Sequence, residues 1–205
     1  SIGRIFKSPL YIDETPGLTL TEFTAKAKRL VREKGVRIIF VDYLQLMHSG
    51  KPMAGGFSKV QEVTEISNTL KTTAKELNVP IIALAQLNRN LMSRMGSNGK
   101  PVLSDLKDSG SIEQDADIVV FLHRPGLIGL TDDPEELAKT EVIFAKNRNG
   151  QVGSVNMRYV GHLMKFEDDH NALYEATMIM DTSGSPTYNP FDEFNPSQNE
   201  FYKNQ

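Results

Sequence analysis

The fold is decided by two apolar stretches that each end in a polar residue, Ile38-Ile39-Phe40-Val41-Asp42 and Ile81-Ile82-Ala83-Leu84-Ala85-Gln86. They belong to longer runs, 36–42 and 79–86, whose continuous apolar and β-branched character is typical of strands covered on both faces. Between them, apolar residues recur at spacings of 3, 4, 4 and 3 and predict a long helix through Val63, Ile66, Leu70, Ala74 and Leu77. Strands alternating with helices predict an α/β fold with a mostly parallel sheet covered by helices on both faces.

The sequence before these strands predicts a strand and a helix. A short apolar strand is expected at 9–13. A helix at 19–34 follows, because Thr19 and Glu22 have the spacing of a capping box and Gly35 provides a stop.

The sequence after them changes character. Residues 104–117 predict a short helical or irregular stretch, and 118–122 predict a further strand. The turn Asn147-Arg148-Asn149-Gly150 is an Asn-Gly hairpin signal. The sheet is therefore expected to end in antiparallel strands, at 141–146, 152–160, 163–166 and 173–180.

Composition excludes several classes of protein. With 205 residues, 39% hydrophobic and 24% charged, the chain is large enough for a packed core. No apolar run exceeds five residues, so no membrane span is expected. The absence of cysteine and of a signal-like N-terminus predicts a cytoplasmic protein. The net charge of −3 neither favours nor forbids nucleic-acid binding, which would need a local basic patch.

Asp42 and Gln86 are the first candidate site residues. An apolar strand that ends in aspartate has the form of a Walker B strand, whose carboxylate partners Mg²⁺ and nucleotide at the carboxyl edge of a sheet. Gln86 would place an amide at the same edge, where it could sense a γ-phosphate or orient a water. The alternatives are an aspartate that caps a turn and a glutamine that ties down the next loop.

The loop 87–108 is the candidate contact with DNA. It is net +2 in a chain that is net −3, because its two aspartates are outnumbered by Arg89, Arg94, Lys100 and Lys107. A basic loop beside a phosphate sensor suits contact with a DNA backbone, and a solvated charged loop is the alternative.

Lys146 and Arg148 stand two residues apart at the tip of the predicted hairpin. Cations held on a rigid hairpin could neutralise the charge that develops on a transferring phosphoryl group. A basic hairpin tip is also an ordinary surface feature.

Six stretches together resemble one family, the C-terminal RecA-like motor domain of bacterial replicative DNA helicases (DnaB). The resemblance covers residues 8–168, and its most specific part is the stretch 103–117. The six stretches are 9–13, 41–47, 74–80, 84–89, 103–117 and 145–150.

This resemblance implies a homohexameric ring that binds ATP and Mg²⁺, translocates on single-stranded DNA, and works with a primase and a helicase loader. It implies that Asp42 partners Mg²⁺ and nucleotide, and that Gln86 couples nucleotide state to the DNA loops. Lys146 and Arg148 would then reach the neighbouring subunit's site. The DNA-contacting positions would be Arg89, Lys107, Asp108 and Gly110, with Lys107 and Asp108 in place of the more usual Arg and Glu.

The largest departure from the family is that the sequence contains no G-x-x-x-x-G-K-[ST] phosphate loop. We therefore expect residues 1–180 to be a partial RecA-like ATPase domain, the Walker B half of a helicase motor that is inactive alone. Residues 181–205, which are rich in proline, asparagine and aromatics, are expected to form an irregular or disordered tail. Two alternatives remain: a non-catalytic interaction module on a RecA-like fold, and a recombinase or clock-type ATPase.

Overall fold

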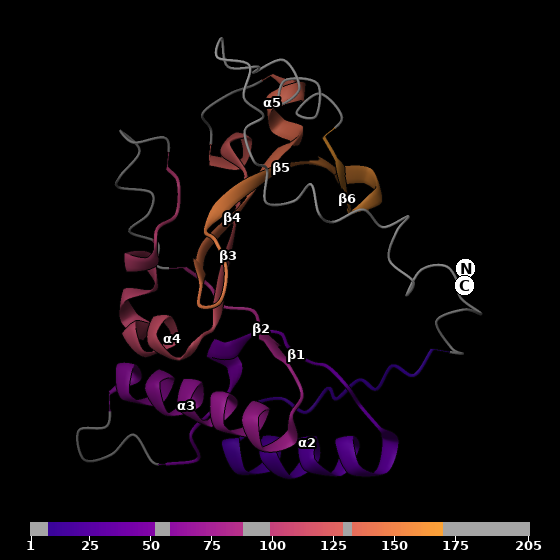
Figure 1. Ribbon diagram of the computed structural model, residues 1–205, viewed down its shortest axis with the longest axis vertical. Coiled ribbons are helices and arrows are strands. Elements are labelled where there is room, and N and C mark those ends of the chain that lie inside the picture. The colour runs from indigo at the N-terminus through magenta and orange to yellow at the C-terminus, as the bar shows by residue number, and fades with distance from the viewer. Residues whose placement is uncertain (1–7, 52–57, 88–98, 129–132, 170–205) are drawn as a thin grey trace. The chain divides into compact units, whose positions relative to one another are not determined.

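A computed structural model describes residues 8–51, 58–87, 99–128 and 133–169. The chain divides into two compact units (Figure 1). The first comprises Ser1–Leu91 and Val102–Ala116, and the second comprises Met92–Pro101 and Asp117–Gln205. Within the described ranges, no helix combines the length and the apolar character needed to cross a bilayer.

The first unit is built on a parallel pair of strands. Strand β1 (Ile39–Val41) pairs in parallel with β2 (Ile81–Ala83), in the register Ile39 with Ile81 and Val41 with Ala83. Its other elements are α2 (Leu20–Lys34), the 3-10 helix η1 (Leu44–Leu46), α3 (Lys59–Leu77), the 3-10 helix η3 (Leu103–Ser109) and α4 (Gly110–Asp115).

Both long helices begin and end at local signals in the sequence. The predicted capping box of α2 is confirmed: the Glu22 N–H donates to Thr19 Oγ1, and the Thr19 N–H donates to Glu22 Oε2 at 3.0 Å. Gly35 ends this helix with a φ of 66°. Helix α3 begins with an equivalent box between Ser58 and Gln61, and it ends at a residue with positive φ, Asn78.

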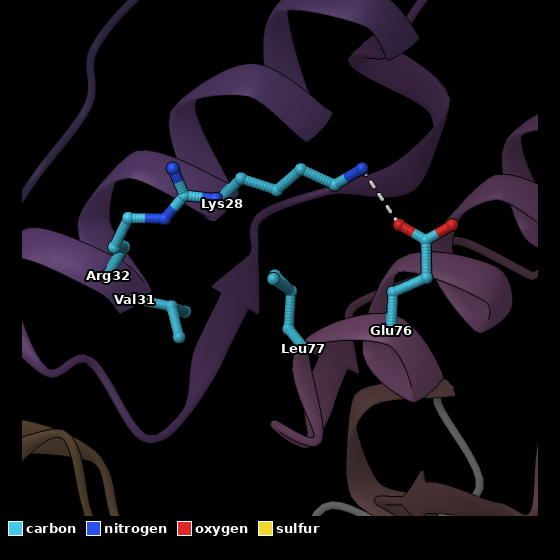
Figure 2. A pocket seen from close by; sticks show the side chains of 5 residues that line it. All are labelled: Lys28, Val31, Arg32, Glu76 and Leu77. Atoms are coloured by element: carbon cyan, nitrogen blue, oxygen red, sulfur yellow. Dashed lines mark ion pairs between the residues drawn. The ribbon is translucent and has the colours of Figure 1, made fainter.

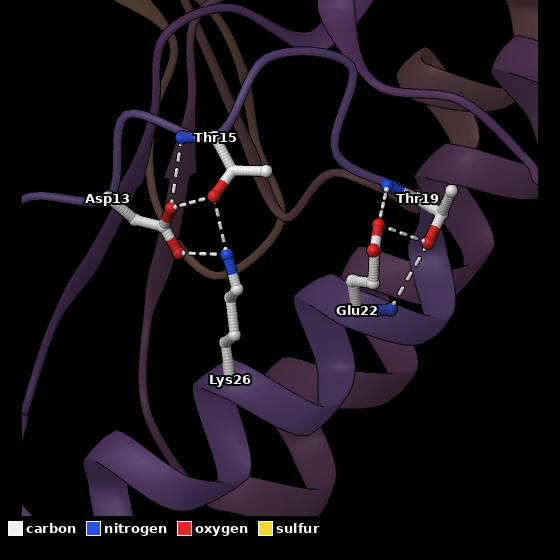
Figure 3. A network of polar contacts seen from close by, with 5 residues as sticks. All are labelled: Asp13, Thr15, Thr19, Glu22 and Lys26. Atoms are coloured by element: carbon white, nitrogen blue, oxygen red, sulfur yellow. Dashed lines mark hydrogen bonds and ion pairs between the residues drawn. The ribbon is translucent and has the colours of Figure 1, made fainter.

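The segment before α2 is tied to that helix by charge (Figure 3). Lys26 Nζ lies 2.7 Å from Asp13 Oδ2, and the Thr15 N–H donates to Asp13 Oδ1 at 3.0 Å. These contacts, with Lys26 first, lower the pKa of Asp13 to about 2. The strand predicted at 9–13 is wrong, because these residues form no ladder with a neighbouring strand and Leu10 and Ile12 remain exposed.

The core of the first unit lies on one face of the strand pair. Ile39, Val41, Ile81 and Ala83 pack against a buried cluster from α2, η1 and α3 that comprises Leu20, Phe23, Leu44, Met47, Val63, Ile66 and Leu70. The alternate residues of the strands face the other way: Phe40 is 65% exposed and Ile82 44% exposed. Helices were expected to cover both faces of the sheet, but within the described residues they cover one face of the parallel strand pair.

The second unit is an antiparallel sheet in the order β3-β4-β5-β6. Its strands are β3 (Ile118–His123), β4 (Lys139–Asn147), β5 (Gly153–Val160) and β6 (Lys165–Asp168). Between β3 and β4 lie the 3-10 helix η4 (Pro125–Ile128) and α5 (Pro134–Ala138), and the 3-10 helix η5 (Gly161–Leu163) precedes β6.

The predicted hairpin is confirmed, since β4 and β5 pair across the Asn-Gly turn. Strand β3 does not extend the parallel pair. It pairs antiparallel with β4, in the four-stranded sheet of the second unit. The α/β class is thus correct, but among the described residues the parallel part has two strands and the antiparallel part forms a separate sheet. The strand predicted at 173–180 and the tail 181–205 lie outside the described residues.

Candidate functional site

Asp42 and Gln86 lie at the same edge of the parallel pair. Asp42 directly follows β1, and Gln86 lies three residues beyond β2. The backbone remains paired past the strands, because the Leu84 N–H donates to the Val41 carbonyl at 2.9 Å and the Leu44 N–H donates to the Leu84 carbonyl at 2.8 Å. Both polar side chains are exposed. The edge therefore presents a carboxylate and an amide to the same solvent region.

The segment after β1 holds Gln86 through a side chain that sequence reasoning missed. Gln45 Nε2 donates to the Gln86 carbonyl at 3.0 Å, and the Gln86 N–H donates to Gln45 Oε1 at 3.2 Å. One side-chain amide thus satisfies both backbone polar groups of Gln86. The available signal was a single polar residue within the apolar run Tyr43-Leu44-Gln45-Leu46-Met47, and its partner lies 41 positions away.

Asp42 is a single carboxylate rather than part of a metal cluster. In the described part of the chain, no three His, Asp or Glu side chains gather where they could hold a metal ion. Mg²⁺ is commonly bound through one or two carboxylates, with phosphates and waters as its other ligands. The donor set at this edge is of that kind, and it would need a phosphate ligand to complete it.

Lys146 and Arg148 lie in the second unit, at the hairpin tip. Lys146 is half-buried in β4 opposite Val119, where the register of the sheet shifts. Arg148 follows the strand and is held twice by Asp117: Nη1 lies 3.1 Å from Oδ1, and the Arg148 N–H donates to the Asp117 carbonyl at 2.8 Å. Asp117 was not identified from the sequence. The ion pair is about half exposed and is therefore weak.

The candidate DNA positions within the described residues lie where η3 meets α4. Lys107 and Asp108 lie in η3, and Gly110 is the first residue of α4. Arg89, with half of the predicted basic loop, lies outside the described residues. Asp105, one of the six charged residues of the predicted loop 87–108, has a structural role. It is buried, and its carboxylate accepts the Val102 N–H at 2.7 Å.

Helix α4 is fastened to α3 by a polar contact. Ser67 Oγ donates to Asp115 Oδ2 at 2.7 Å, and Ser67 is buried at 7% exposure. Sequence reasoning missed this contact, which joins residues 48 positions apart.

Lys100, from the predicted basic loop, belongs to a cluster of ionisable side chains in the second unit with Glu141 and His123. Lys100 Nζ lies 2.6 Å from Glu141 Oε2, and Glu141 is the cross-strand neighbour of the buried His123. Burial lowers the pKa of His123, which keeps the imidazole neutral. Burial alone would raise the pKa of Glu141, but hydrogen bonds from Lys100 and Ser154 outweigh it and hold that pKa below its ordinary value.

A shallow pocket on the first unit lies away from the candidate residues (Figure 2). Its lining comes from α2 and α3, with Lys28 and Glu76 paired at 2.8 Å above Val31, Arg32 and Leu77. Since Asp42, Gln86 and Gln45 do not line it, the pocket is separate from the strand edge.

Comparison with known proteins defines the class of this fold. Two solved structures resemble it at 35% identity. One is described as an ATPase domain and has a TM-score of 0.73, and the other, "The Structure Of A DnaB-Like Replicative Helicase And Its Interactions With Primase", has a TM-score of 0.71. Each similarity covers 82% of this chain, and 58% and 39% of the other chains respectively. The chain therefore has the RecA-like fold of helicase ATPase domains.

The DnaB-like helicase C terminal domain family matches residues 1–168, and the chain belongs to this family. The relatives include "Replicative DNA helicase DnaB" of Leifsonia xyli subsp. xyli, 47% identical over 166 residues. They also include "Replicative DNA helicase DnaC" of Bacillus subtilis, 44% identical over 167 residues. Each match covers 81% of this chain and 35% of the relative, so the chain spans about a third of these proteins. Membership of this family excludes a recombinase or clock-type ATPase.

Proposed function

We propose that this chain is the Walker B half of the motor domain of a replicative DNA helicase. The motor would couple ATP hydrolysis at subunit interfaces to movement along single-stranded DNA and to duplex unwinding during replication. One observation carries the proposal: Asp42 and Gln86 lie exposed at one edge of a parallel strand pair. Membership of the DnaB-like helicase family and similarity to replicative helicases support it.

Each candidate residue has a distinct role in this proposal. Asp42 holds Mg²⁺, and Gln86 senses the phosphates and relays their presence to the loop that begins at the next residue. When bound, ATP would supply the phosphoryl group and Mg²⁺ would neutralise its charge. Lys146 and Arg148 act on the site of a neighbouring subunit, where a guanidinium stabilises charge on the transferring group.

The remaining parts of the proposal concern partners. Arg89, Lys107, Asp108 and Gly110 contact the backbone of single-stranded DNA. The complete protein is a cytoplasmic homohexamer that works with a primase and a helicase loader. The primase part is supported by one structural relative, which is described with its primase interactions. This chain alone does not hydrolyse ATP, because it has no phosphate loop to position the nucleotide.

Mixed rings test the arrangement across subunits. In the complete helicase, Arg148→Ala should lower kcat by about 10³-fold or more while nucleotide binding changes little, because this cation acts on transition-state charge. Random 1:1 mixing with Asp42→Ala subunits leaves about one interface in four with both groups intact. We therefore expect up to about a quarter of the original ATPase activity to return. No recovery at any ratio would contradict action in trans, and a complete protein without turnover would favour the non-catalytic interaction module.

A salt titration tests the DNA contact. Lys107→Ala in the complete helicase should weaken binding to homopolymeric single strands equally for all bases. The slope of log affinity against log salt should fall by about 0.7 for each phosphate that the protein no longer neutralises. An unchanged slope, or an effect confined to one base, would mean that the DNA follows another path.

A further inference from the structure

The backbone at Gln86 is held by a side chain instead of by a neighbouring strand. Beyond Ala83, β2 has no further ladder residue in β1, because the chain after Val41 turns into η1. The last backbone bond between the two segments runs from the Leu44 N–H to the Leu84 carbonyl. Gln45 supplies the next two bonds, at 3.0 and 3.2 Å.

A primary amide is well suited to this task. It presents one donor and one acceptor in the same plane, as a peptide group does, so it can pair with the N–H and the C=O of a single residue. Neither an aliphatic nor a charged side chain of similar length offers both functions. The Gln45 amide thus continues the parallel pairing by one residue.

This contact joins a residue shortly after Asp42, the first candidate polar group, to Gln86, the second. Gln45 lies three residues after Asp42, and Gln86 immediately precedes the loop that contains Arg89. Movement of the segment after Asp42 would therefore be passed to the backbone of Gln86 through two directional bonds. Gln45 is half-buried, whereas Gln86 and both bonds are exposed, so water competes with each bond and the link depends on the two acting together.

We propose that Gln45 is a positioning residue for nucleotide-dependent DNA coupling. It fixes the main chain of Gln86, and it thereby links the Mg²⁺-binding edge at Asp42 to the loop that follows Gln86. This inference rests on the proposed function, because it assigns Gln45 a part in that same site.

Three substitutions in the complete helicase separate the chemistry of the amide from its size. Gln45→Ala removes both bonds, and Gln45→Asn keeps the amide but shortens its reach by about 1.5 Å, beyond hydrogen-bond distance. Each should lower the ratio of DNA-stimulated to basal ATPase rate by about tenfold, as expected when one or two hydrogen bonds hold the active geometry. The KM for ATP should change less than about twofold.

The third substitution, Gln45→Glu, gives a readout that a purely structural role would not produce. A carboxylate accepts the Gln86 N–H but opposes the Gln86 carbonyl, whereas the protonated acid donates to that carbonyl. Each unit fall in pH above the pKa raises the protonated fraction about tenfold. The stimulation ratio of Gln45→Glu relative to wild type should therefore rise between pH 8 and pH 5.5, and a flat profile would overturn the proposal.

Gln61 provides a matched control in the same unit. Its side chain accepts the Ser58 N–H at 2.8 Å, so Gln61→Ala also removes a glutamine-to-backbone bond, at a position remote in sequence from Gln86. This variant should keep the wild-type stimulation ratio. Hydrogen exchange adds a direct measurement: Gln45→Ala should speed exchange at the Gln86 N–H by about tenfold, and Gln61→Ala should leave it unchanged.

The outcomes distinguish this inference from the proposed function. A wild-type helicase without DNA-stimulated turnover would overturn the proposed function. A stimulated wild type whose Gln45→Ala variant keeps the full stimulation ratio would overturn only the role of Gln45. Equal losses for Gln45→Ala and Gln61→Ala would likewise reduce Gln45 to a general contributor to stability.

Discussion

The contact between Ser67 and Asp115 gives a prediction about α4, the helix that begins at the candidate DNA position Gly110. Helix α4 has six residues, far fewer than an isolated helix needs for stability in water. It therefore depends on its packing against α3 and on the 2.7 Å bond from Ser67 Oγ to Asp115 Oδ2. We expect Ser67→Ala to loosen α4 locally while the remainder of the unit stays folded.

The magnitude follows from the burial and the charge of this pair. Hydrogen bonds to charged groups contribute about 1.5–3 kcal/mol, and partial exposure of Asp115 places this one near the lower end. Alanine leaves almost no cavity, so the transfer and cavity contributions stay small. A loss of about 1.5 kcal/mol corresponds to roughly a tenfold rise in the population of open α4.

Hydrogen exchange of the peptide covering 110–116 measures this opening. Ser67→Ala should speed its exchange about tenfold, and peptides from α2 should not change. Asn68→Ala is the matched control, because the neighbouring Asn68 amide donates only to Thr64 within the same helix turn, at 3.2 Å.

A double-mutant cycle with Asp115→Asn isolates the pair. The coupling free energy between Ser67→Ala and Asp115→Asn should be about 1 kcal/mol, since the two residues are in direct contact. Exchange within twofold of wild type for Ser67→Ala, or a coupling below about 0.3 kcal/mol, would refute the reasoning. The position of Gly110 would then depend on apolar packing alone.

Three further predictions concern charge. Burial lowers the pKa of His123, so below about pH 6.5 the unfolded state binds a proton that the folded state does not bind. The stability of the chain should therefore fall as the pH drops below about 6.5. In His123→Gln the melting temperature should depend less on pH. In an NMR titration, Lys26→Ala should raise the pKa of Asp13 from about 2 toward 3.8, and stability from this pair, below about 1 kcal/mol, should disappear as pH falls through that range. Asp117→Asn weakens the exposed ion pair with Arg148, so steady-state assays of the complete helicase should show kcat within about fivefold of wild type.

Each of these has a contrary result. A His123→Gln variant with the same pH profile as wild type would place the proton uptake elsewhere. An unshifted Asp13 titration would mean that the Lys26 contact does not persist in solution. A loss of kcat beyond about tenfold in Asp117→Asn would show that Asp117 positions Arg148 for its reaction.

The helices and the hairpin were predictable because their signals are local. The capping box at Thr19 and the stop at Gly35 place α2 nearly to the residue, and the apolar spacing from Val63 to Leu77 predicts the body of α3. The Asn-Gly step likewise places the turn between β4 and β5. These features are set by dihedral preferences and by hydrogen bonds within a few positions.

Strand extent and pairing were not predictable in the same way. An apolar run shows that a segment can be buried, but a strand also requires a neighbour, and nothing local says which one it has. Residues 9–13 therefore form no strand, and Ile118–His123 pairs with β4 instead of extending the parallel pair. The edge shared by Asp42 and Gln86 was predictable, since parallel strands necessarily align their carboxyl ends.

The polar contacts that sequence reasoning missed share a range of energies. Each contact joins a single pair of residues: Gln45 with Gln86, Ser67 with Asp115, and Asp117 with Arg148. Such contacts contribute about 0.5–2 kcal/mol, whereas deleting a large apolar residue from the core costs about 2–5 kcal/mol. A shift of 1–2 kcal/mol changes a two-state population by about five- to thirtyfold, which the binding of a nucleotide or a DNA strand can readily supply. In the proposed motor, the core formed around Ile66 and Leu70 would then stay intact while the Gln86 backbone, α4 and Arg148 were repositioned, as is required if loops move with each nucleotide.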